Sequence, residues 1–225
     1  MKLSHLRSSS RSGFTLVELL VVIGIIAILA AVVLSGANQA INSARRMKTL
    51  SMGNQIATAV QNYYTEYSFY PTPANQATAQ DTYYAYNDRT AWEPMIVALC
   101  GGLDPGLPQQ GQVANNAIPN SRQISYLSPN RADLDTTKAP AVIKTPFLRN
   151  GTAQYYFMAV DTNYDTVLGD KDQPAGKIPN FAGAKANTAL TMSAGITAGV
   201  AVWSNCDQDP TGNAATNPNY WVHTF

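Results

Sequence analysis

The chain has 225 residues, with 15 Lys and Arg, 14 Asp and Glu, and a formal net charge of +1. This balance does not favour a nucleic-acid-binding protein, because such a protein needs a basic surface to neutralise phosphates. Two His and two Cys also provide little for His-based catalysis or for a Cys/His zinc site. Enzymes of those kinds are therefore not expected, and because the sequence offers no nucleophile–base constellation we expect no enzyme.

The N-terminal residues 1–13 are basic and lead into a long apolar segment, residues 14–37. No charged residue occurs from Leu19 to Ala44, and about 20 apolar residues are enough to cross a bilayer core. A secretory signal has a shorter apolar core with a small-residue cleavage site behind it. Here the small residue, Gly13, precedes the apolar run, so we expect residues 14–37 to remain in the mature protein as a transmembrane helix.

The orientation of this helix does not follow from charge counting, because three basic residues precede the span and three follow it closely. A short basic leader is easily retained while the long polar part is exported. We therefore expect the N-terminus to be inside.

Glu18 lies within the apolar segment, where an unpaired carboxylate costs several kcal/mol. In one interpretation it lies near the membrane interface and snorkels or is protonated. In the other it pairs with a cation when helices bundle, for instance the free amine of a neighbour's Phe14. Ionisable residues within membrane segments are usually functional, which favours the second interpretation.

Residues 13–20, GFTLVELL, resemble the cleavage and methylation motif of the type IV filament superfamily, which includes type IV pilins and the pseudopilins of type II secretion. The resemblance implies that residues 1–13 are a leader, that a prepilin peptidase cuts between Gly13 and Phe14, and that Phe14 is N-methylated. It also implies that Glu18 guides insertion of the subunit into a filament.

The same resemblance implies the partners and the location. The partners are copies of this chain in a homopolymer filament, other pseudopilins or pilins, the prepilin peptidase, an inner-membrane assembly platform and membrane lipid. The chain is expected in the bacterial inner membrane as a single-pass protein, with a cytoplasmic N-terminus and a periplasmic head, and in a filament after assembly. We predict no nucleic-acid partner for the head.

Residues 38–70 are predicted to continue the helix in amphipathic form. Side chains recur at three- and four-residue steps, the period of a helix with one buried face; they are Ile41, Ala44, Lys48, Met52, Ile56, Val60, Tyr63 and Tyr67. Lys48 is expected to snorkel, and Ser35-Gly36 and Gly53 are the weak points of the helix. The helix is predicted to end before Pro71. The tyrosines and proline of residues 64–72 are similar to the stretch that follows the long helix in major pseudopilins.

The polar head, residues 71–225, is predicted to begin with a loop over 74–88. A helix follows with Thr90 as its N-cap and Glu93 at the third position, and it ends at Gly101-Gly102. Its buried stripe is Trp92, Met95, Ile96 and Leu99, and residues 103–120 form a loop. Strands are predicted at Gln123–Leu127, Ala153–Val160, Gly199–Ser204 and Tyr220–His223. The fold class is α+β, a long helix on a small antiparallel sheet, and the resemblance implies the same pilin-like fold.

Oxygen ligands alternate in the loop that follows the strand predicted at 153–160. Asp161, Asn163 and Asp165 occupy the first, third and fifth positions of an EF-hand-type loop, and Asp172 occupies the twelfth. Thr166, however, stands where the sharp turn favours glycine. The loop is therefore either a calcium site or a polar Asx-turn loop, and an EF-hand is excluded because no helix flanks it.

The C-terminal residues resemble in part the tail of major pseudopilins, in which calcium is bound. The matching positions are Trp203-Ser204, Asp207, Asp209 and Trp221, while Asn217 and Asn219 lie near the place of the family's acidic pair. This departure weakens the implied calcium site, to which Asp207 and Asp209 could still contribute.

Cys100 and Cys206 would face an oxidising compartment after export, where two cysteines usually join. The alternatives are a Cys100–Cys206 disulfide and two separate thiols, with Cys100 buried on its helix.

The resemblance favours a structural pseudopilin subunit of the periplasmic filament of type II secretion. A type IV pilin for adhesion, motility or DNA uptake is the alternative within the superfamily. A membrane-anchored calcium- or ligand-binding module that never polymerises is a third interpretation, against which Glu18 argues.

Overall fold

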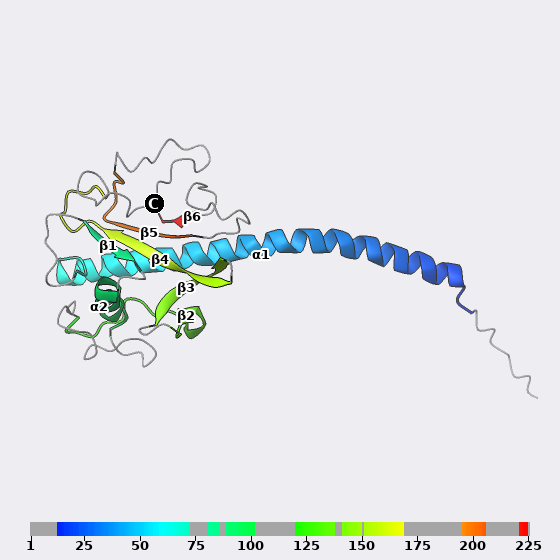
Figure 1. The fold of residues 1–225 in the computed structure, drawn as a ribbon, viewed down its shortest axis with the longest axis horizontal. Coiled ribbons are helices and arrows are strands. Elements are labelled where there is room, and N and C mark those ends of the chain that lie inside the picture. The colour runs from blue at the N-terminus through cyan, green and yellow to red at the C-terminus, as the bar shows by residue number, and fades with distance from the viewer. Residues whose placement is uncertain are drawn as a thin grey trace, which may run out of the picture. The chain divides into compact units, whose positions relative to one another are not determined.

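The computed structural model describes residues 13–72, 81–85, 89–101, 120–137, 141–149, 151–168, 195–205 and 221–224. Its contacts divide the chain into two compact units, Met1–Ala44 and Arg45–Phe225, which we describe separately. Most of the predicted leader and of the predicted loop 103–120 lie outside the described residues. The described residues form a long N-terminal helix and a small antiparallel sheet (Figure 1), so the predicted α+β class is confirmed.

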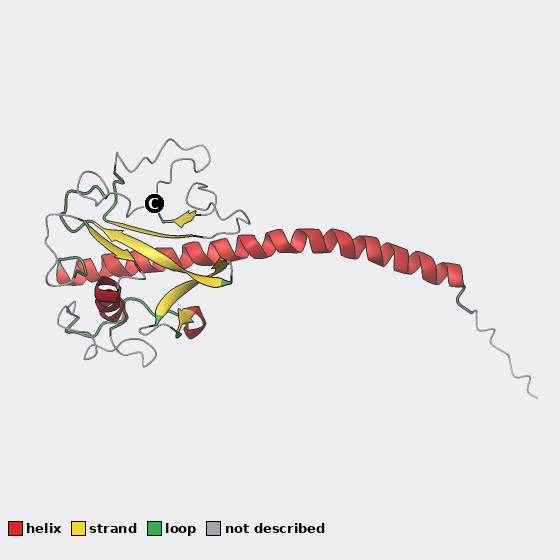
Figure 2. Cartoon of the chain, in the orientation of Figure 1, coloured by secondary structure: helices red, strands yellow, loops and turns green. Residues whose placement is uncertain are grey.

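Helix α1, Leu16–Tyr67, is continuous (Figure 2). It passes through both predicted weak points, Gly36 and Gly53, without a break. In the first unit its side chains are exposed: the large apolar residues between Phe14 and Leu34 are 44–79% accessible. By length and composition, α1 includes a stretch long and apolar enough to cross a membrane.

In the second unit, α1 has one buried face. The predicted stripe is confirmed at Met52, Ile56, Val60 and Tyr63. It is wrong at Ile41 and Ala44, which are exposed. Both residues belong to the first unit, whereas the buried stripe belongs to the second. The helix ends before Pro71 as predicted, with Ser68 at φ +61°.

Among the described residues the sheet has six strands, all paired antiparallel. They are β1 (Thr82–Ala85), β2 (Leu134–Asp135), β3 (Val142–Arg149), β4 (Thr152–Val160), β5 (Val200–Asn205) and β6 (Trp221–His223). The order is β2-β3-β4-β5-β6, and β1 also pairs with β4. Strand β4 is therefore central: β5 lies along one edge, and β3 and β1 share the other.

The predicted strands at 153–160, 199–204 and 220–223 are confirmed as β4, β5 and β6. The predicted strand at 123–127 is wrong, because buried Asn120 ties this segment to a helix end. The Asn120 amide nitrogen donates to Ala98 O (2.7 Å) and Ile124 O (2.8 Å). Tyr126 N and Leu127 N both donate to Leu99 O. These bonds satisfy carbonyls at a helix C-terminus and leave the segment outside the sheet.

Three strands were not predicted: β1, β3 and the two-residue β2, which pairs with the start of β3. The predicted loop 74–88 contains β1, whose four residues pair with the end of β4. Strand β3 contains Pro146, and proline normally argues against a strand because it cannot donate to the ladder. The register of β3 against β4 shifts between Lys144 and Leu148, and an irregularity of this kind accommodates the proline.

Helix α2, Arg89–Cys100, confirms the predicted second helix. Its predicted N-cap is wrong: Thr90 lies inside the helix, which begins at Arg89. The predicted stop is confirmed at Gly101, whose φ is +74° and where an added Cβ would lie 2.9 Å from Gln123 O. A one-turn 3₁₀ helix, η1 (Arg131–Asp133), precedes β2.

Side chains on the two faces of β4 and β5 belong to different clusters. Met158, Val160 and Val202 pack with the buried stripe of α1 and with α2 in the main core. Trp203 and Ala159 form a second cluster with Leu168 and Ile196. This second cluster places the segment after β4 against the sheet, and that segment carries the predicted oxygen ligands.

Candidate functional site

The first turn of α1 is closed by a capping box. Thr15 N and Thr15 Oγ1 both donate to Glu18 Oε2, at 2.9 and 2.8 Å, and Glu18 N donates to Thr15 Oγ1 at 3.3 Å. When Thr is followed three residues later by Glu, their side chains accept hydrogen bonds from backbone N–H groups that have no partner within the first turn of a helix. The sequence contains this spacing at both Thr15-Glu18 and Thr90-Glu93, but a capping box was predicted only for the second pair.

The capping box gives the Glu18 carboxylate partners within its own chain. The pairing of Glu18 with a neighbour's amine stays a prediction, as do cleavage after Gly13 and methylation of Phe14. Phe14 is 77% exposed, and a Cβ added at Gly13 would meet no atom within 4 Å. The predicted cleavage point is therefore accessible in this structure.

Three acidic side chains meet at one end of the sheet. A carboxylate oxygen of each of Asp81, Asp161 and Asp165 lies within 4.8 Å of the others. Asp81 immediately precedes β1 and Asp161 immediately follows β4, and both are buried. Of the predicted ligands, Asp161 and Asp165 are thus brought together, and Asp81 joins them. The sequence pattern missed Asp81 because only strand pairing brings it to the loop.

The segment after β4 also contains the Asx turns of the alternative interpretation. Asp165 N donates to Asn163 Oδ1 at 3.1 Å, and Val167 N donates to Asp165 Oδ1 at 2.8 Å. Thr166 N donates to Asp161 Oδ2 at 2.9 Å. Thr166 has φ +70°, so it makes the left-handed turn for which glycine is favoured. The segment after β4 therefore contains Asx turns together with two of the three clustered carboxylates, Asp161 and Asp165.

Aromatic rings connect the same segment to the end of α1. Tyr164 stacks on Tyr70 with ring centroids 5.6 Å apart, and Tyr70 stacks on Tyr64 at 4.6 Å. Tyr70 N donates to Tyr164 Oη at 3.3 Å. Gly199 allows this packing, because a Cβ at Gly199 would collide with the Tyr70 hydroxyl. Desolvation, followed by the nearby Asp161 carboxylate, raises the pKa of Tyr70.

Several predicted site residues lie outside the described residues: Asp172, Cys206, Asp207 and Asp209. Cys100 is buried at the end of α2, so the disulfide with Cys206 stays a prediction. Trp203 and Ser204 lie in β5 and Trp221 begins β6. The calcium site implied for the C-terminal tail therefore stays a prediction too.

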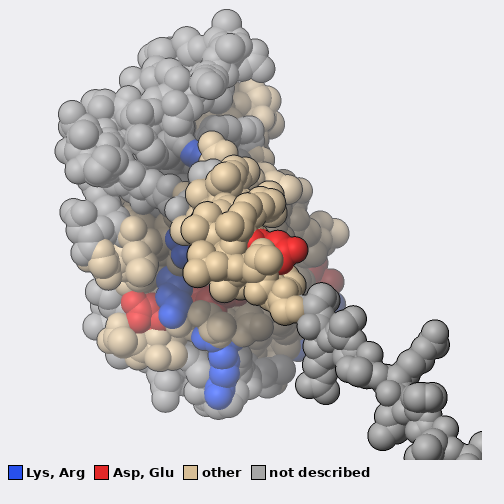
Figure 3. Space-filling model, turned by 90° about the vertical axis from the view of Figure 1, so that its right-hand side faces the viewer, with Lys and Arg blue, Asp and Glu red and all other residues tan. Residues whose placement is uncertain are grey.

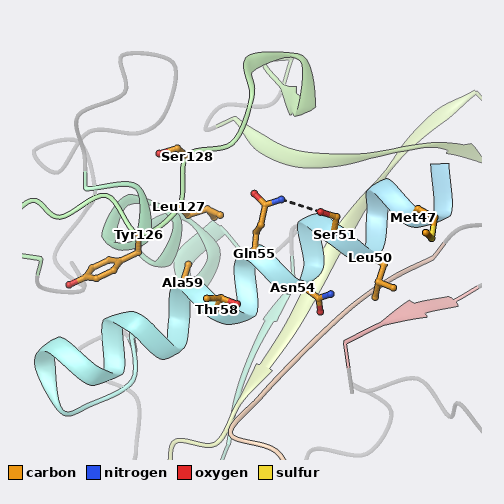
Figure 4. Close-up of a pocket in the computed structure, with 10 residues that line it drawn as sticks. All are labelled: Met47, Leu50, Ser51, Asn54, Gln55, Thr58, Ala59, Tyr126, Leu127 and Ser128. Carbon is orange, nitrogen blue, oxygen red and sulfur yellow. Dashed lines mark hydrogen bonds between the residues drawn. The ribbon is translucent and has the colours of Figure 1, made fainter. Parts of the chain in front are cut away.

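A groove of about 520 Å³ runs between α1 and the segment that Asn120 holds (Figure 4). Its walls are formed by residues 47–59 of α1 and by Tyr126, Leu127 and Ser128. Within it, Gln55 Nε2 donates to Ser51 Oγ at 3.4 Å. The residues that line the groove include no charged side chain, and its surface combines apolar with neutral polar groups.

Charged and uncharged side chains are mixed on the part of the surface that Figure 3 shows. Among the residues that the structure describes, two ion pairs join α1 to other segments of the second unit: Lys48 pairs with Asp133, and Arg122 pairs with Glu66. Lys48 is predicted to snorkel, and in the structure its half-exposed side chain extends to the carboxylate of Asp133 in η1.

Comparison with protein families finds the prokaryotic N-terminal methylation motif at residues 8–34. No curated protein and no solved structure matches the chain. The motif indicates a type IV pilin-like prepilin, which implies processing by a prepilin peptidase and assembly with pilin-like subunits. It points to a structural subunit with a membrane-anchoring helix.

Proposed function

We propose that the chain is a pseudopilin, a structural subunit of the periplasmic filament of a type II secretion system. The observation that carries the proposal is the methylation motif at residues 8–34, which runs directly into an exposed apolar helix with Glu18 in its first turn. In this proposal the peptidase removes residues 1–13 and methylates Phe14. The head is exported and the N-terminus faces the cytoplasm.

The exposure of the apolar helix supports assembly. A helix that is apolar on all sides is stable when it is buried in a membrane or among other helices. Before assembly, lipid covers residues 14–37 in the inner membrane. In the filament, the same residues of neighbouring copies cover one another, while the polar heads face outward.

Glu18 has a second role in this proposal. Its capping box closes the helix of the isolated subunit, and its charge pairs with the methylated amine of a neighbour's Phe14 during insertion. Opposite charges attract strongly where water is excluded, so this pairing would set the position of an incoming subunit. The platform in the inner membrane supplies that subunit.

The segment after α1 favours a pseudopilin over a type IV pilin. Tyr70-Pro71-Thr72 resembles the stretch found in major pseudopilins, and here contacts fix its first two residues. The Tyr84 hydroxyl donates to Pro71 O, and Tyr70 stacks between Tyr64 and Tyr164. A type IV pilin remains the alternative, because pilins carry the same methylation motif.

Glu18→Gln and Thr15→Ala separate the two roles of Glu18. Glutamine at the third helical position keeps the capping hydrogen bonds and removes the charge, whereas Thr15→Ala weakens the cap and keeps the charge. We expect Glu18→Gln to be processed and membrane-inserted but absent from filaments. Thr15→Ala should still assemble. Equal incorporation of the two variants into the periplasmic filament, measured by cross-linking of neighbouring subunits in the cell envelope and immunoblotting, would contradict the proposed charge pairing.

Deletion of the gene separates pseudopilin from pilin. We expect the deletion strain to retain folded secretion substrates in the periplasm and to keep its surface fibres and twitching motility. Loss of fibres with normal secretion would establish the pilin instead.

A further inference from the structure

We propose that Asp81, Asp161 and Asp165 bind a calcium ion that joins the start of β1 to the segment after β4. The proposal concerns the head alone and does not depend on where the filament is deployed. Asp81 belongs to neither set of ligands that the sequence suggested.

Strand register places two of the carboxylates opposite each other. Thr82 pairs with Val160 in the antiparallel ladder of β1 and β4, so the next pair along the strands is Asp81 with Asp161. Like charges directly opposite each other destabilise an antiparallel pair. The hydroxyls of Thr82 and Thr162 lie 3.1 Å apart and hold the strand ends together. A cation between the carboxylates converts this repulsion into attraction.

Asp161 supplies an independent indication of a ligand. Its side chain is 3% exposed, and its Oδ2 accepts a hydrogen bond from Thr166 N. Its Oδ1 is buried and has no hydrogen-bond partner among the described residues. A buried carboxylate oxygen without a partner costs free energy. Because the same carboxylate belongs to the cluster with Asp81 and Asp165, a bound cation is the partner that the site provides for.

The distances suit calcium. Oxygen ligands lie about 2.3–2.6 Å from Ca²⁺, so two ligands of one ion are at most about 5 Å apart. The three carboxylate oxygens lie within 4.8 Å of one another. Magnesium needs a near-ideal octahedron at about 2.0–2.1 Å and gives up its water reluctantly, so it is seldom held by a cage of protein oxygens alone. Asp165 is exposed, so water can complete the larger and less regular shell of calcium.

The bound ion would also order the contact between this segment and the end of α1. Tyr164 lies next to Asp165 in the chain, and its ring stacks on Tyr70. Fixing the carboxylate of Asp165 therefore restrains Tyr164, Tyr70 and the segment that follows α1. Calcium is thus expected to stabilise the head where it holds the long helix.

The test is thermal unfolding of the full-length chain in detergent after treatment with EGTA, followed by addition of CaCl₂. A ligand that binds only the folded state stabilises it by mass action, and we expect an increase in Tm of roughly 5–10 °C at saturating calcium. Asp161→Asn should abolish the increase. Because it relieves the repulsion with Asp81, its metal-free form should melt no lower than metal-free wild type.

Asp133→Asn is the matched control, because Asp133 pairs with Lys48 away from the cluster, and it should keep the full calcium response. An unchanged Tm of the wild type on adding CaCl₂ would overturn the proposal. So would a calcium response that persists in Asp161→Asn, or an equal response to MgCl₂ at the same concentration. None of these results would affect processing or filament incorporation, which are measured separately.

Discussion

The two parts of α1 are one continuous helix in two different environments. In residues 16–44, apolar side chains point outward on all sides, whereas in residues 45–67 a single stripe is buried under the sheet. The contrast shows that the hydrophobic core of the second unit includes one face of the second part. The first part is helical, and its apolar side chains belong to no core cluster among the described residues. A helix that is apolar on all sides is stable when lipid or other helices cover it.

The largest expected effect is a loss of head stability when the buried stripe is truncated. Ile56 is fully buried and Ile25 is 53% exposed. Ile56→Ala should lower the free energy of unfolding of the head by about 2–5 kcal/mol. Ile25→Ala in detergent should change it by less than about 0.5 kcal/mol. Denaturant unfolding of the full-length chain, followed by near-UV circular dichroism, measures both. Equal losses would mean that both parts of α1 share one core.

Alkaline pH should act on the head and spare the first part of α1. Burial raises the pKa of Tyr83 to about 12 and also raises the pKa of Tyr63 and of Tyr84, while residues 13–44 contain no tyrosine. Since the folded state holds these phenols neutral, the stability they contribute is present below the unfolded pKa of about 10. It is lost as the pH rises from about 10 through 12.

We therefore expect near-UV signal to disappear between about pH 10 and 12 while helix signal from residues 16–44 persists in detergent. Tyr83→Phe should make this loss shallower. The assignment of the pH dependence to the head would be contradicted if the near-UV signal and the helix signal of residues 16–44 disappeared together. It would also be contradicted if Tyr83→Phe lost stability with pH as steeply as the wild type.

The smallest expected effect concerns the ion pair at the boundary of the second unit. Lys48 pairs with Asp133, and the lysine side chain is 53% exposed. Lys48→Met keeps an apolar side chain and removes the charge. It should lower the free energy of unfolding of the head by about 0.2–1 kcal/mol, and by less at high salt. Comparison with Lys48→Met/Asp133→Asn in a double-mutant cycle measures the pair. A coupling above about 2 kcal/mol would show that this contact, rather than the buried stripe, secures the helix.

The parts of the fold that depend on local pattern were predictable. The continuous α1, the stripe from Met52 onward and strands β4 and β5 follow from periodicity and aromatic content. The C-terminal stop of α2 follows from Gly101. In each case the signal lies within a few residues of the feature.

The missed parts depend on distant contacts. Strand β3 exists despite Pro146, because a shift in register removes the need for its amide. Residues 123–127 resemble a strand in composition, but the side chain of Asn120 bonds them to α2. No local pattern reports a partner that is 22 residues away.

The candidate sites divide in the same way. The methylation motif and the oxygen ligands Asp161 and Asp165 were visible as sequence spacing. Asp81 was not, because its position opposite Asp161 follows from the pairing of β1 with β4. The capping role of Glu18 was a missed local signal, since Thr15 stands three residues before it.

The central claim, that the chain is a processed pilin-like subunit, is tested most directly by the mass of its N-terminal peptide. We predict that the mature chain begins with N-methylated Phe14, and that deleting the prepilin peptidase leaves residues 1–13 attached. Gly13→Ala should also block cleavage, although the added Cβ meets no atom within 4 Å; Gly24→Ala, at an equally open position, should be processed normally. An unmethylated N-terminus at any other residue, unchanged in the peptidase deletion, would contradict the account.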